Sequence, residues 1–264
     1  MTFENKTIWI TGASSGIGEA CAYLFAREKA HLILTGTREE KLVEVQRRCL
    51  KEGGRCEVLP YDLSDLDGIP SLVEKALHFF GCIDVVFNNA GISQRAKAGD
   101  TLFDVDRKIM DINYFAPVRI TKLLLPVMIE NGGGVLVTTT SISGRFGFPL
   151  RSAYAASKHA LYGFFESLQA EYYKENIRSV IICPGRVKTN ISFYALEKDG
   201  KQHGKMDAGQ AGGLSSEKAA KKIVKAIRKR KPEVLVGGKE LLMVYFKRFV
   251  PSLNRLLARK IKSE

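Results

Sequence analysis

The feature that most constrains the fold is a glycine-rich turn near the N-terminus. Residues 7–10 form an apolar run that predicts a buried strand, and residues 19–28 have a helical pattern. The turn between them, residues 11–18, reads TGASSGIG. Glycines let a backbone approach a pyrophosphate closely, and a helix N-terminus offers unpaired N–H groups with partial positive charge. Strand, glycine turn and helix together predict a phosphate-binding site, with a purely structural turn as the alternative.

The rest of the chain alternates between strand-like and helical runs. The strand-like runs fall at residues 7–10, 31–35, 56–59, 83–87, 134–140, 178–183 and 233–236. This βαβ pattern predicts an α/β fold with a parallel sheet and right-handed crossovers. With 264 residues and 45% hydrophobic content, the chain can bury one sizeable core, so we expect a single domain.

The residues after the second strand bear on cofactor choice. Gly36-Thr37-Arg38 follows residues 31–35 and contains no acid. In dinucleotide-binding folds an acid at this point binds a ribose 2′-hydroxyl, whereas hydroxyl or basic groups suit a 2′-phosphate. Thr37 and Arg38 therefore favour NADP(H) over NAD(H), unless Arg38 is simply solvated.

Polar residues also follow the third and fourth strands. Asp62, followed by Leu63, either binds an adenine amino group or caps the next turn. The carboxamides and glycine of Asn88-Asn89-Ala90-Gly91 either hold the loops around a nucleoside or form a polar turn.

A second constellation centres on YAASK at residues 154–158. Tyr154 and Lys158 are four residues apart, so on a helix they share one face. A free phenol has a pKa of ~10, and acid/base chemistry near neutrality requires that pKa to be lower by roughly 3 units. A nearby ammonium lowers the pKa of a phenol. Ser141 follows the run 134–140, where its hydroxyl could face the phenol. An ordinary surface pair is the alternative, and Ser141 argues against it.

With these motifs in view, the chain resembles the short-chain dehydrogenase/reductase family. The family's order and spacing recur across residues 6–237, in TGASSGIG at 11–18, Asp62-Leu63, NNAG at 88–91, Asn113, Ser141, YAASK at 154–158, and Pro184-Gly185 with Val187 and Thr189. Weaker similarity in residues 47–50, 92–95, 157–165 and 190–192 resembles the dehydrogenase/reductase member 7 subgroup. Members of that subgroup typically carry an N-terminal membrane anchor, which residues 1–6 do not lead us to expect here.

The resemblance implies a doubly wound, Rossmann-like, seven-stranded sheet and hydride transfer between NADP(H) and a carbonyl or alcohol carbon. Tyr154 is expected to exchange the proton, Ser141 to polarise the substrate oxygen, and Lys158 to lower the pKa of Tyr154 while holding the nicotinamide ribose. Asn113 is expected to distort the helix 104–131 and hold a water, rather than be a surface amide.

These four residues are the expected catalytic set, and Ser141 and Tyr154 the substrate-binding pair. The expected cofactor-binding residues are Gly12, Ser14, Ser15, Gly16, Ile17, Gly18, Thr37, Arg38, Asp62, Leu63, Asn89, Ala90, Gly91, Tyr154, Lys158, Pro184, Gly185, Val187 and Thr189. A homodimer or homotetramer built through the central helices is also expected.

Composition narrows the remaining classes. The five cysteines are scattered and lack a Cys-x-x-Cys pair, which argues against disulfides and zinc and for a reducing, cytoplasmic setting; we expect no metal. No run approaches 18 apolar residues, so we expect neither secretion nor a membrane span. A net charge of +13 makes nucleic-acid binding a possible function, but no nucleic-acid-binding motif accompanies the charge. We therefore expect no nucleic-acid partner. A non-catalytic nucleotide-binding scaffold or redox sensor of the same fold remains the alternative function.

Residues 191–214 have the glycine- and alanine-rich composition of a mobile lid. Apolar residues near it could line a pocket for a bulky lipidic carbonyl such as a steroid, retinoid or quinone, or could simply pack beneath the lid. They are Phe146, Phe148, Pro149, Leu150, Phe193, Tyr194 and Leu196.

The C-terminal part of the chain is strongly basic. Residues 217–264 carry fifteen Lys or Arg and four Asp or Glu. We therefore divide the chain into a catalytic domain, residues 1–238, and a basic amphipathic extension, residues 239–264, which Pro251 splits into two segments, the second ending in Ile261 and Lys262. The extension either folds over the substrate cleft or a subunit interface, or lies in an anionic membrane interface.

Overall fold

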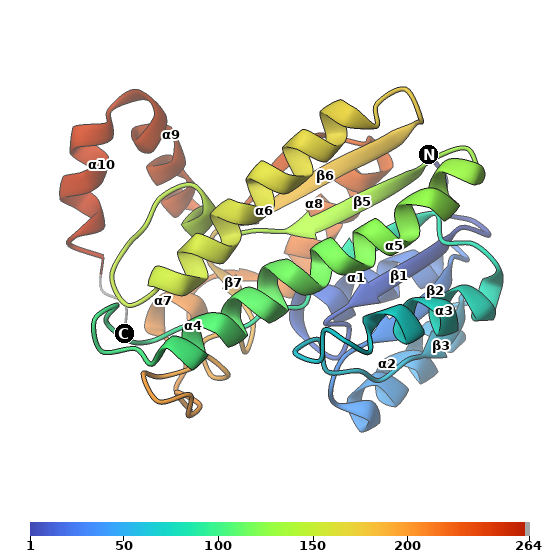
Figure 1. Ribbon diagram of the computed structural model, residues 1–264, viewed down its shortest axis with the longest axis horizontal. Helices are drawn as coiled ribbons and strands as arrows, with labels where there is room; N and C mark the ends of the chain where they lie inside the picture. Colours follow the sequence, from blue (N-terminus) through green and yellow to red (C-terminus); the bar gives the residue numbers. More distant parts are fainter. Residues whose placement is uncertain (262–264) are drawn as a thin grey trace.

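A computed structural model describes residues 1–261; Lys262 and the two residues after it lie outside the described part. Its core is a seven-stranded parallel sheet of order β3-β2-β1-β4-β5-β6-β9, which confirms the predicted doubly wound fold (Figure 1). The strands are β1 (Thr7–Thr11), β2 (His31–Thr35), β3 (Arg55–Val58), β4 (Val85–Asn88), β5 (Gly134–Thr139), β6 (Ile177–Pro184) and β9 (Glu233–Val236).

Helices cover both faces of the sheet (Figure 1). One apolar core lies under α1 (Gly16–Arg27), α2 (Glu39–Lys51) and α8 (Ser216–Arg228). The other lies under α3 (Ile69–Phe80), α5 (Ala116–Glu130) and α6 (Ser152–Glu171). Both faces of the sheet are therefore buried, which explains why its strands read as apolar runs rather than as alternating ones.

The strand order reverses between β1 and β4. Ile8 pairs with Leu32 on one side and with Val85 on the other, so the chain leaves β1 toward β2 and returns across it to β4. In doubly wound sheets the crevice at this reversal, beyond the carboxyl ends of the strands, is where ligands bind. The glycine turn after β1 and the Asn89–Gly91 loop after β4 both lie at this point.

The long helix predicted at residues 104–131 runs from Phe103 to Glu130, but it is not continuous α-helix. A π-helical turn, η1 (Asp111–Phe115), separates α4 (Phe103–Met110) from α5. Within residues 1–261 this is also the one helical stretch long and apolar enough to pass a membrane-span criterion. Half of its apolar window is buried, and it packs against α3 and α6 as a core helix does.

A pairing of two short strands around the predicted lid was not predicted from the sequence, whereas the two segments of the extension, split at Pro251, were. The two-residue strands β7 (Val187–Lys188) and β8 (Leu214–Ser215) pair in parallel and lie at the two ends of the predicted lid. The predicted lid contains the short helix α7 (Ala208–Ala211). After β9, η3 (Lys239–Leu241) leads into α9 (Leu242–Phe249) and α10 (Pro251–Ala258), which lie side by side at one end of the molecule (Figure 1).

Candidate cofactor and active site

A cavity of about 690 Å³ opens at the carboxyl edge of the sheet. Of the predicted cofactor-binding residues, all but Gly18 line it, and so do Ser141, Tyr154 and Lys158. Gly18 and Asn113 lie behind its wall. The structure therefore brings into one cleft residues that the sequence scatters over nearly 180 positions.

The glycine turn requires its glycines for two physical reasons. Gly12 and Gly16 have positive φ angles, +66° and +63°, which residues other than glycine rarely adopt. A Cβ at Gly18 would lie 2.4 Å from the carbonyl oxygen of Gly12, so this glycine keeps α1 tight against the turn. The result is an open floor leading to the N-terminus of α1, which suits a pyrophosphate.

The loop after β4 is fixed to the glycine turn. The hydroxyl of Thr11 accepts hydrogen bonds from the backbone N–H groups of Asn89 and Ala90, both at 3.1 Å. The Asn89 side chain donates to the carbonyls of Thr11 and Gly12, both at 3.2 Å. Of the two carboxamides predicted to hold the loops, Asn89 makes these bonds, whereas the side chain of Asn88, buried at the end of β4, has no hydrogen-bond partner among the described residues. Asp62 also lines the cleft while its carboxylate accepts a hydrogen bond from Ser64 N at 2.9 Å, so both of its predicted roles fit the geometry.

Arg38 points into the cleft and contacts other cleft residues. Its guanidinium donates to the hydroxyls of Ser14 at 3.2 Å, Ser15 at 3.0 Å and Tyr194 at 3.1 Å. Tyr194 belongs to the predicted lid, residues 191–214, so Arg38 connects the two sides of the cleft. Thr37 beside it is exposed at the rim.

Ser141 and Tyr154 lie at the other end of the cleft and are both buried. Ser141 follows β5, and its hydroxyl accepts a hydrogen bond from Ser143 N at 3.1 Å, beginning the short helix η2 (Ile142–Gly144). Tyr154 lies in the first turn of α6. Burial raises the pKa of Tyr154, against which a hydrogen bond from Ser141 and the charges of Arg151 and Arg95 act to lower it.

Lys158 lies one turn further along α6 and is almost fully buried. Its ammonium donates to the carbonyl oxygen of Thr139 at 2.9 Å and lies 5.8 Å from the ring centroid of Tyr154. Burial lowers the pKa of Lys158 to about 7. The effect of Lys158 on the pKa of Tyr154 stays a prediction, and the charges of Arg151 and Arg95 lower that pKa as well.

Asn113 lies at the centre of the π-helical turn and is fully buried. Its side chain accepts from Ile92 N at 2.9 Å and donates to Ile92 O at 2.9 Å and to the Ser157 hydroxyl at 3.0 Å. It is therefore not a surface amide, and the expected distortion of its helix is present. A Cβ at Gly91 would lie 3.0 Å from the Asn113 carboxamide and 3.3 Å from the Lys158 ammonium, so Gly91 leaves room for both.

The end of β6 completes the cofactor side of the cleft. Gly185 donates its N–H to Val236 O at 2.8 Å, and Thr189 faces the glycine turn, where a Cβ on Gly16 would lie 3.0 Å from its methyl group. Gln210 of α7 donates to the Thr189 hydroxyl at 3.2 Å. Gln210 was not predicted, because nothing in its local sequence marks it.

The apolar end of the cleft agrees in part with the prediction. Phe146, Phe148, Tyr194 and Leu196 line it, whereas Pro149 and Leu150 do not, and Phe193 is turned outward with 40% of its surface exposed. Met243 of α9 and Ile261 were not predicted there, yet both line the cleft. The inner face of the C-terminal extension therefore folds over this site.

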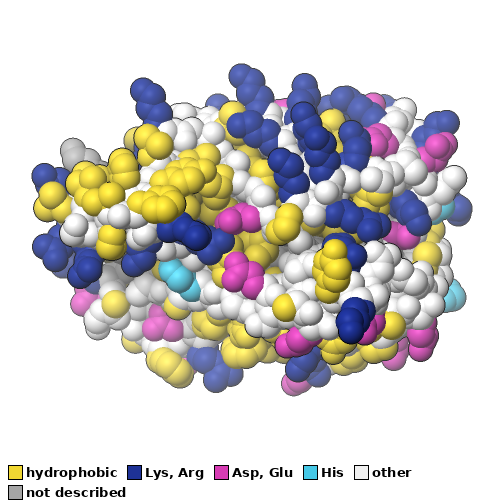
Figure 2. All heavy atoms as spheres, turned by 90° about the horizontal axis from the view of Figure 1, so that it is seen from above, with side chains coloured by type: hydrophobic (Ala, Val, Ile, Leu, Met, Phe, Trp, Pro, Cys, Tyr) yellow, Lys and Arg dark blue, Asp and Glu magenta, His cyan; other side chains and the backbone are white. Residues whose placement is uncertain are grey.

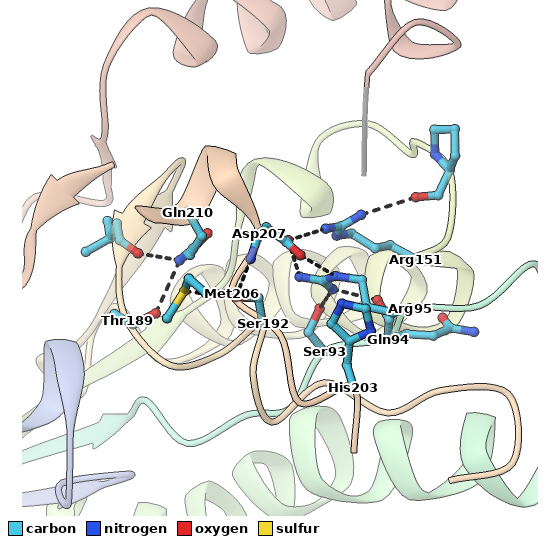
Figure 3. Close-up of polar contacts among 12 residues, drawn as sticks. Ser93, Gln94, Arg95, Arg151, Thr189, Ser192, His203, Met206, Asp207 and Gln210 are labelled. Atoms are coloured by element: carbon cyan, nitrogen blue, oxygen red, sulfur yellow. Dashed lines mark hydrogen bonds and ion pairs between the residues drawn. The ribbon is translucent and has the colours of Figure 1, made fainter. Parts of the chain in front are cut away.

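Three charged residues at this end were missed by sequence reasoning. Asp207, just before α7, pairs with Arg95 at 2.6 Å and with Arg151 at 2.9 Å (Figure 3). Their side chains are between 4% and 11% exposed, and all three line the cleft. They tie the predicted lid to the loop after β4 and to the start of α6. Only the position of Arg151, three residues before Tyr154, is a local signal.

Comparison with known proteins places the chain in a family. The model of the short chain dehydrogenases matches residues 6–200, and the chain belongs to this family. It resembles dehydrogenase/reductase SDR family member 7B of Mus musculus, with 40% identity over 267 residues, 99% of this chain and 83% of the mouse protein. A dehydrogenase/reductase SDR family protein 7-like of Drosophila melanogaster is 39% identical over 94% of this chain and 78% of its own length.

Solved structures agree with this placement. A short-chain dehydrogenase from Streptomyces avermitilis is 28% identical, with a TM-score of 0.83 over 97% of this chain and 96% of its own. A family member from Burkholderia phymatum, crystallised in complex with NAD, has the same TM-score at 21% identity and shows the shared fold. The chain is thus a short-chain dehydrogenase/reductase of the member 7 subgroup. It belongs to an oxidoreductase family and has a nucleotide-binding fold.

Proposed function

We propose that this chain is an NADP(H)-dependent oxidoreductase that interconverts a carbonyl and an alcohol. The observation that carries the proposal is the meeting of Ser141, Tyr154 and Lys158 at one end of a cleft whose other end is the glycine turn. Gly12 and Gly91 both line this cleft, and its place at the reversal of the strand order fits a dinucleotide lying along it. When bound, the nicotinamide supplies the hydride chemistry.

In this proposal the protein's own residues position the substrate and move the proton. Tyr154 is the general acid/base and exchanges its phenolic proton with the substrate oxygen, and Ser141 polarises that oxygen. Lys158 holds the nicotinamide ribose and passes protons between the cleft and the buried site of Asn113. These roles fit the burial of all four side chains, because burial excludes water from the reacting groups.

The proposed preference for NADP(H) rests on Arg38. Its guanidinium lies among the hydroxyls of Ser14 and Ser15, beside the first turn of α1. A 2′-phosphate there would receive charge-assisted hydrogen bonds, which are about twice as strong as neutral ones. Such a phosphate would also compete with Tyr194 for Arg38.

An apolar substrate fits the other end of the cleft. Phe146, Phe148, Leu196, Met243 and Ile261 supply its apolar surface, next to the Ser141–Tyr154 pair. The test is oxidation of NADPH and NADH followed by absorbance against a panel of apolar ketones, aldehydes and quinones. We expect turnover with NADPH and at least one panel member. Binding of NADPH without turnover of any member would instead favour the non-catalytic scaffold.

We also propose that the C-terminal extension, residues 239–264, docks on an anionic membrane surface. Six large apolar side chains on its outer face are each at least 36% exposed: Leu242, Tyr245, Phe249, Val250, Leu253 and Leu256. Lys and Arg side chains surround this apolar patch at the end of the molecule that carries α9 and α10 (Figure 2). The inner face packs on the core through Met243, Val244 and Ile261, so the patch lies beside the apolar end of the cleft.

Charge decides between a membrane and a second copy of the chain as the occupant of this patch. Lys247, Arg248, Arg255, Arg259 and Lys260 are exposed around it. Glu240, the one acid of the described part of the extension, accepts hydrogen bonds from Gly238 N and Arg186 N instead. A symmetric contact between two copies would bring like charges together, whereas an anionic bilayer attracts each basic residue by about 1 kcal/mol.

Co-sedimentation with vesicles tests the membrane proposal. Wild type should pellet with phosphatidylglycerol-rich vesicles at low salt and much less with phosphatidylcholine alone. Leu256→Glu should reduce pelleting severalfold, whereas Leu50→Glu, at an equally exposed leucine of α2, serves as the matched control and should not. Equal pelleting of the two variants would rule out the patch as the docking surface.

A cytoplasmic location and a homodimer or homotetramer are further parts of the proposal. All five cysteines are free thiols, which fits a reducing compartment. Leu102, Phe103, Phe115 and Leu123, on and next to the central helices α4 and α5, are exposed and available for subunit contact. Light scattering coupled to gel filtration should give a mass at least twice that of the chain.

A further inference from the structure

Two buried arginines share the carboxylate of Asp207 in the cleft that Tyr154 lines. Arg95 alone forms a two-bond ion pair with Asp207, through Nε at 3.2 Å and Nη2 at 2.6 Å. Its remaining nitrogen, Nη1, donates to the Ser93 hydroxyl at 2.8 Å and Gln94 O at 2.6 Å (Figure 3). This pair already joins the lid to the loop after β4. Arg151 donates to the same carboxylate, and its guanidinium is buried beside that of Arg95.

Arg151 is placed by contacts from three directions. It is the residue before the first turn of α6, three positions before Tyr154, and its carbonyl accepts the helical N–H of Ala155 at 2.8 Å. Its guanidinium donates to Asp207 at 2.9 Å and to Pro149 O at 3.3 Å. It also lies 5.1 Å from the centroid of the Phe148 ring. Its position in the cleft that Tyr154 also lines is therefore fixed by charge, hydrogen bonds and packing together.

We propose that Arg151 is a positioning residue of the Tyr154 site, held by Asp207 so that its permanent charge favours the ionised form of the phenol. The proposal rests on the proposed role of Tyr154 and adds a second cation to it. Lys158 is poorly suited to be the sole cation, since its buried ammonium loses its proton readily near neutral pH. Burial and the charge of Arg95 lower the pKa of Arg151 to about 10, so Arg151 stays charged where Lys158 does not.

The other groups facing Tyr154 do not supply this charge. Cys183, at the end of β6, is a buried thiol whose pKa burial raises to about 11, so it is neutral near pH 7. Ser141 contributes a hydrogen bond, and Arg95 a weaker charge effect than Arg151. The further charged groups of the same cleft are Lys108 on α4, Arg186 after β6, Glu240 on η3, and Asp62 and Arg38 at the cofactor end.

Tyrosine labelled with ¹³C at Cζ makes the ionisation of Tyr154 directly visible by NMR. The full-length protein is titrated with and without NADP⁺, and the Tyr154→Phe variant identifies the signal among the nine tyrosines. Arg151→Gln should raise the pKa of Tyr154 by about one unit, as expected for loss of a nearby charge in a partly screened site. Arg151→Lys should keep it near the wild-type value, and Arg95→Gln should raise it less.

The sign of the shift separates the proposal from a merely structural role. Burial is the largest cause of the raised pKa of Tyr154, so a variant that only loosens the site and admits water should lower that pKa. Arg119→Gln, at an exposed arginine of α5, removes the same charge elsewhere and should change nothing. A lowered or unchanged pKa in Arg151→Gln would overturn the proposal, as would a wild-type phenol that fails to ionise before the protein unfolds.

Because the titration needs no turnover, it is independent of the proposed activity. Absence of turnover in the wild type would count against the proposed function alone. An active wild type with an unshifted Tyr154 in Arg151→Gln would count against the role of Arg151 alone.

Discussion

At the scale of the residue, the proposed preference for NADP(H) depends on one guanidinium. Arg38 ends the β2 loop with three hydroxyls around it, and no carboxylate occupies residues 36–38 to repel a phosphate. In the proposal this arrangement suits a 2′-phosphate better than a 2′-hydroxyl, because the phosphate carries negative charge that Arg38 offsets.

Replacement of Arg38 should therefore raise the KM for NADPH more than the KM for NADH. A charge-assisted hydrogen bond contributes about 1.5–3 kcal/mol, so Arg38→Ala should raise the KM for NADPH roughly tenfold to hundredfold. The KM for NADH should change less than about threefold. Steady-state kinetics with both cofactors measures this, with Arg119→Ala as an exposed control. Equal losses with both cofactors would refute the assignment.

At the scale of the element, a single buried amide lies at the break in the longest helix. Asn113 bonds to Ile92 and Ser157 instead of packing an apolar side chain there, and the helix widens to five π-helical residues around it. π-helical turns of this kind often occur at functional sites.

Removal of this amide should destabilise the protein measurably. Asn113→Ala leaves the N–H and the carbonyl of Ile92 without their partner in the interior, which costs about 1–3 kcal/mol per unsatisfied group. Urea denaturation should show this loss in the free energy of unfolding. Asn131→Ala, whose amide caps the exposed end of α5, should cost less than half as much. A wild-type midpoint for Asn113→Ala would mean that the π-turn does not depend on the amide.

Local sequence patterns were sufficient for the large elements and insufficient for the small ones. The seven strands of the sheet start and end within about two residues of their predicted positions, because apolar runs and glycine turns are local signals. The two-residue strands β7 and β8 carry too few residues for any pattern. The Asp207 cluster depends on contacts between residues 56 and 112 positions apart, which no local pattern encodes.

At the scale of the whole molecule, buried charge links stability to pH. The pKa of Lys158 is about 7 in the folded protein and near ~10.4 in an unfolded chain, so between these values the unfolded state binds more protons. The contribution of Lys158 to stability is therefore fully present above the unfolded value and is lost as pH falls to 7.

Comparison with a neutral variant isolates this contribution. The free energy of unfolding of the wild type minus that of Lys158→Met should rise between pH 7 and 9, by at most about 1.4 kcal/mol per pH unit. Chemical denaturation at several pH values measures it. A difference that stays flat would show that Lys158 keeps its proton in the folded state.

The extension and the cleft also belong together at this scale. Met243 and Ile261 complete the apolar end of the site, while the outer face of the same C-terminal extension exposes Phe249 and Leu256. A single C-terminal element therefore borders both the proposed substrate site and the proposed membrane surface, which gives an apolar substrate a short path between them.

The most direct test of the central claim is the kinetics of Tyr154→Phe with NADPH and the best carbonyl substrate from the panel. The variant keeps the ring and loses only the hydroxyl that exchanges the proton. The account predicts a kcat lower by at least ~10²-fold, with the Kd for NADPH, measured by fluorescence, within about twofold of the wild type. Turnover equal to that of the wild type would contradict the assignment of Tyr154 as the general acid/base.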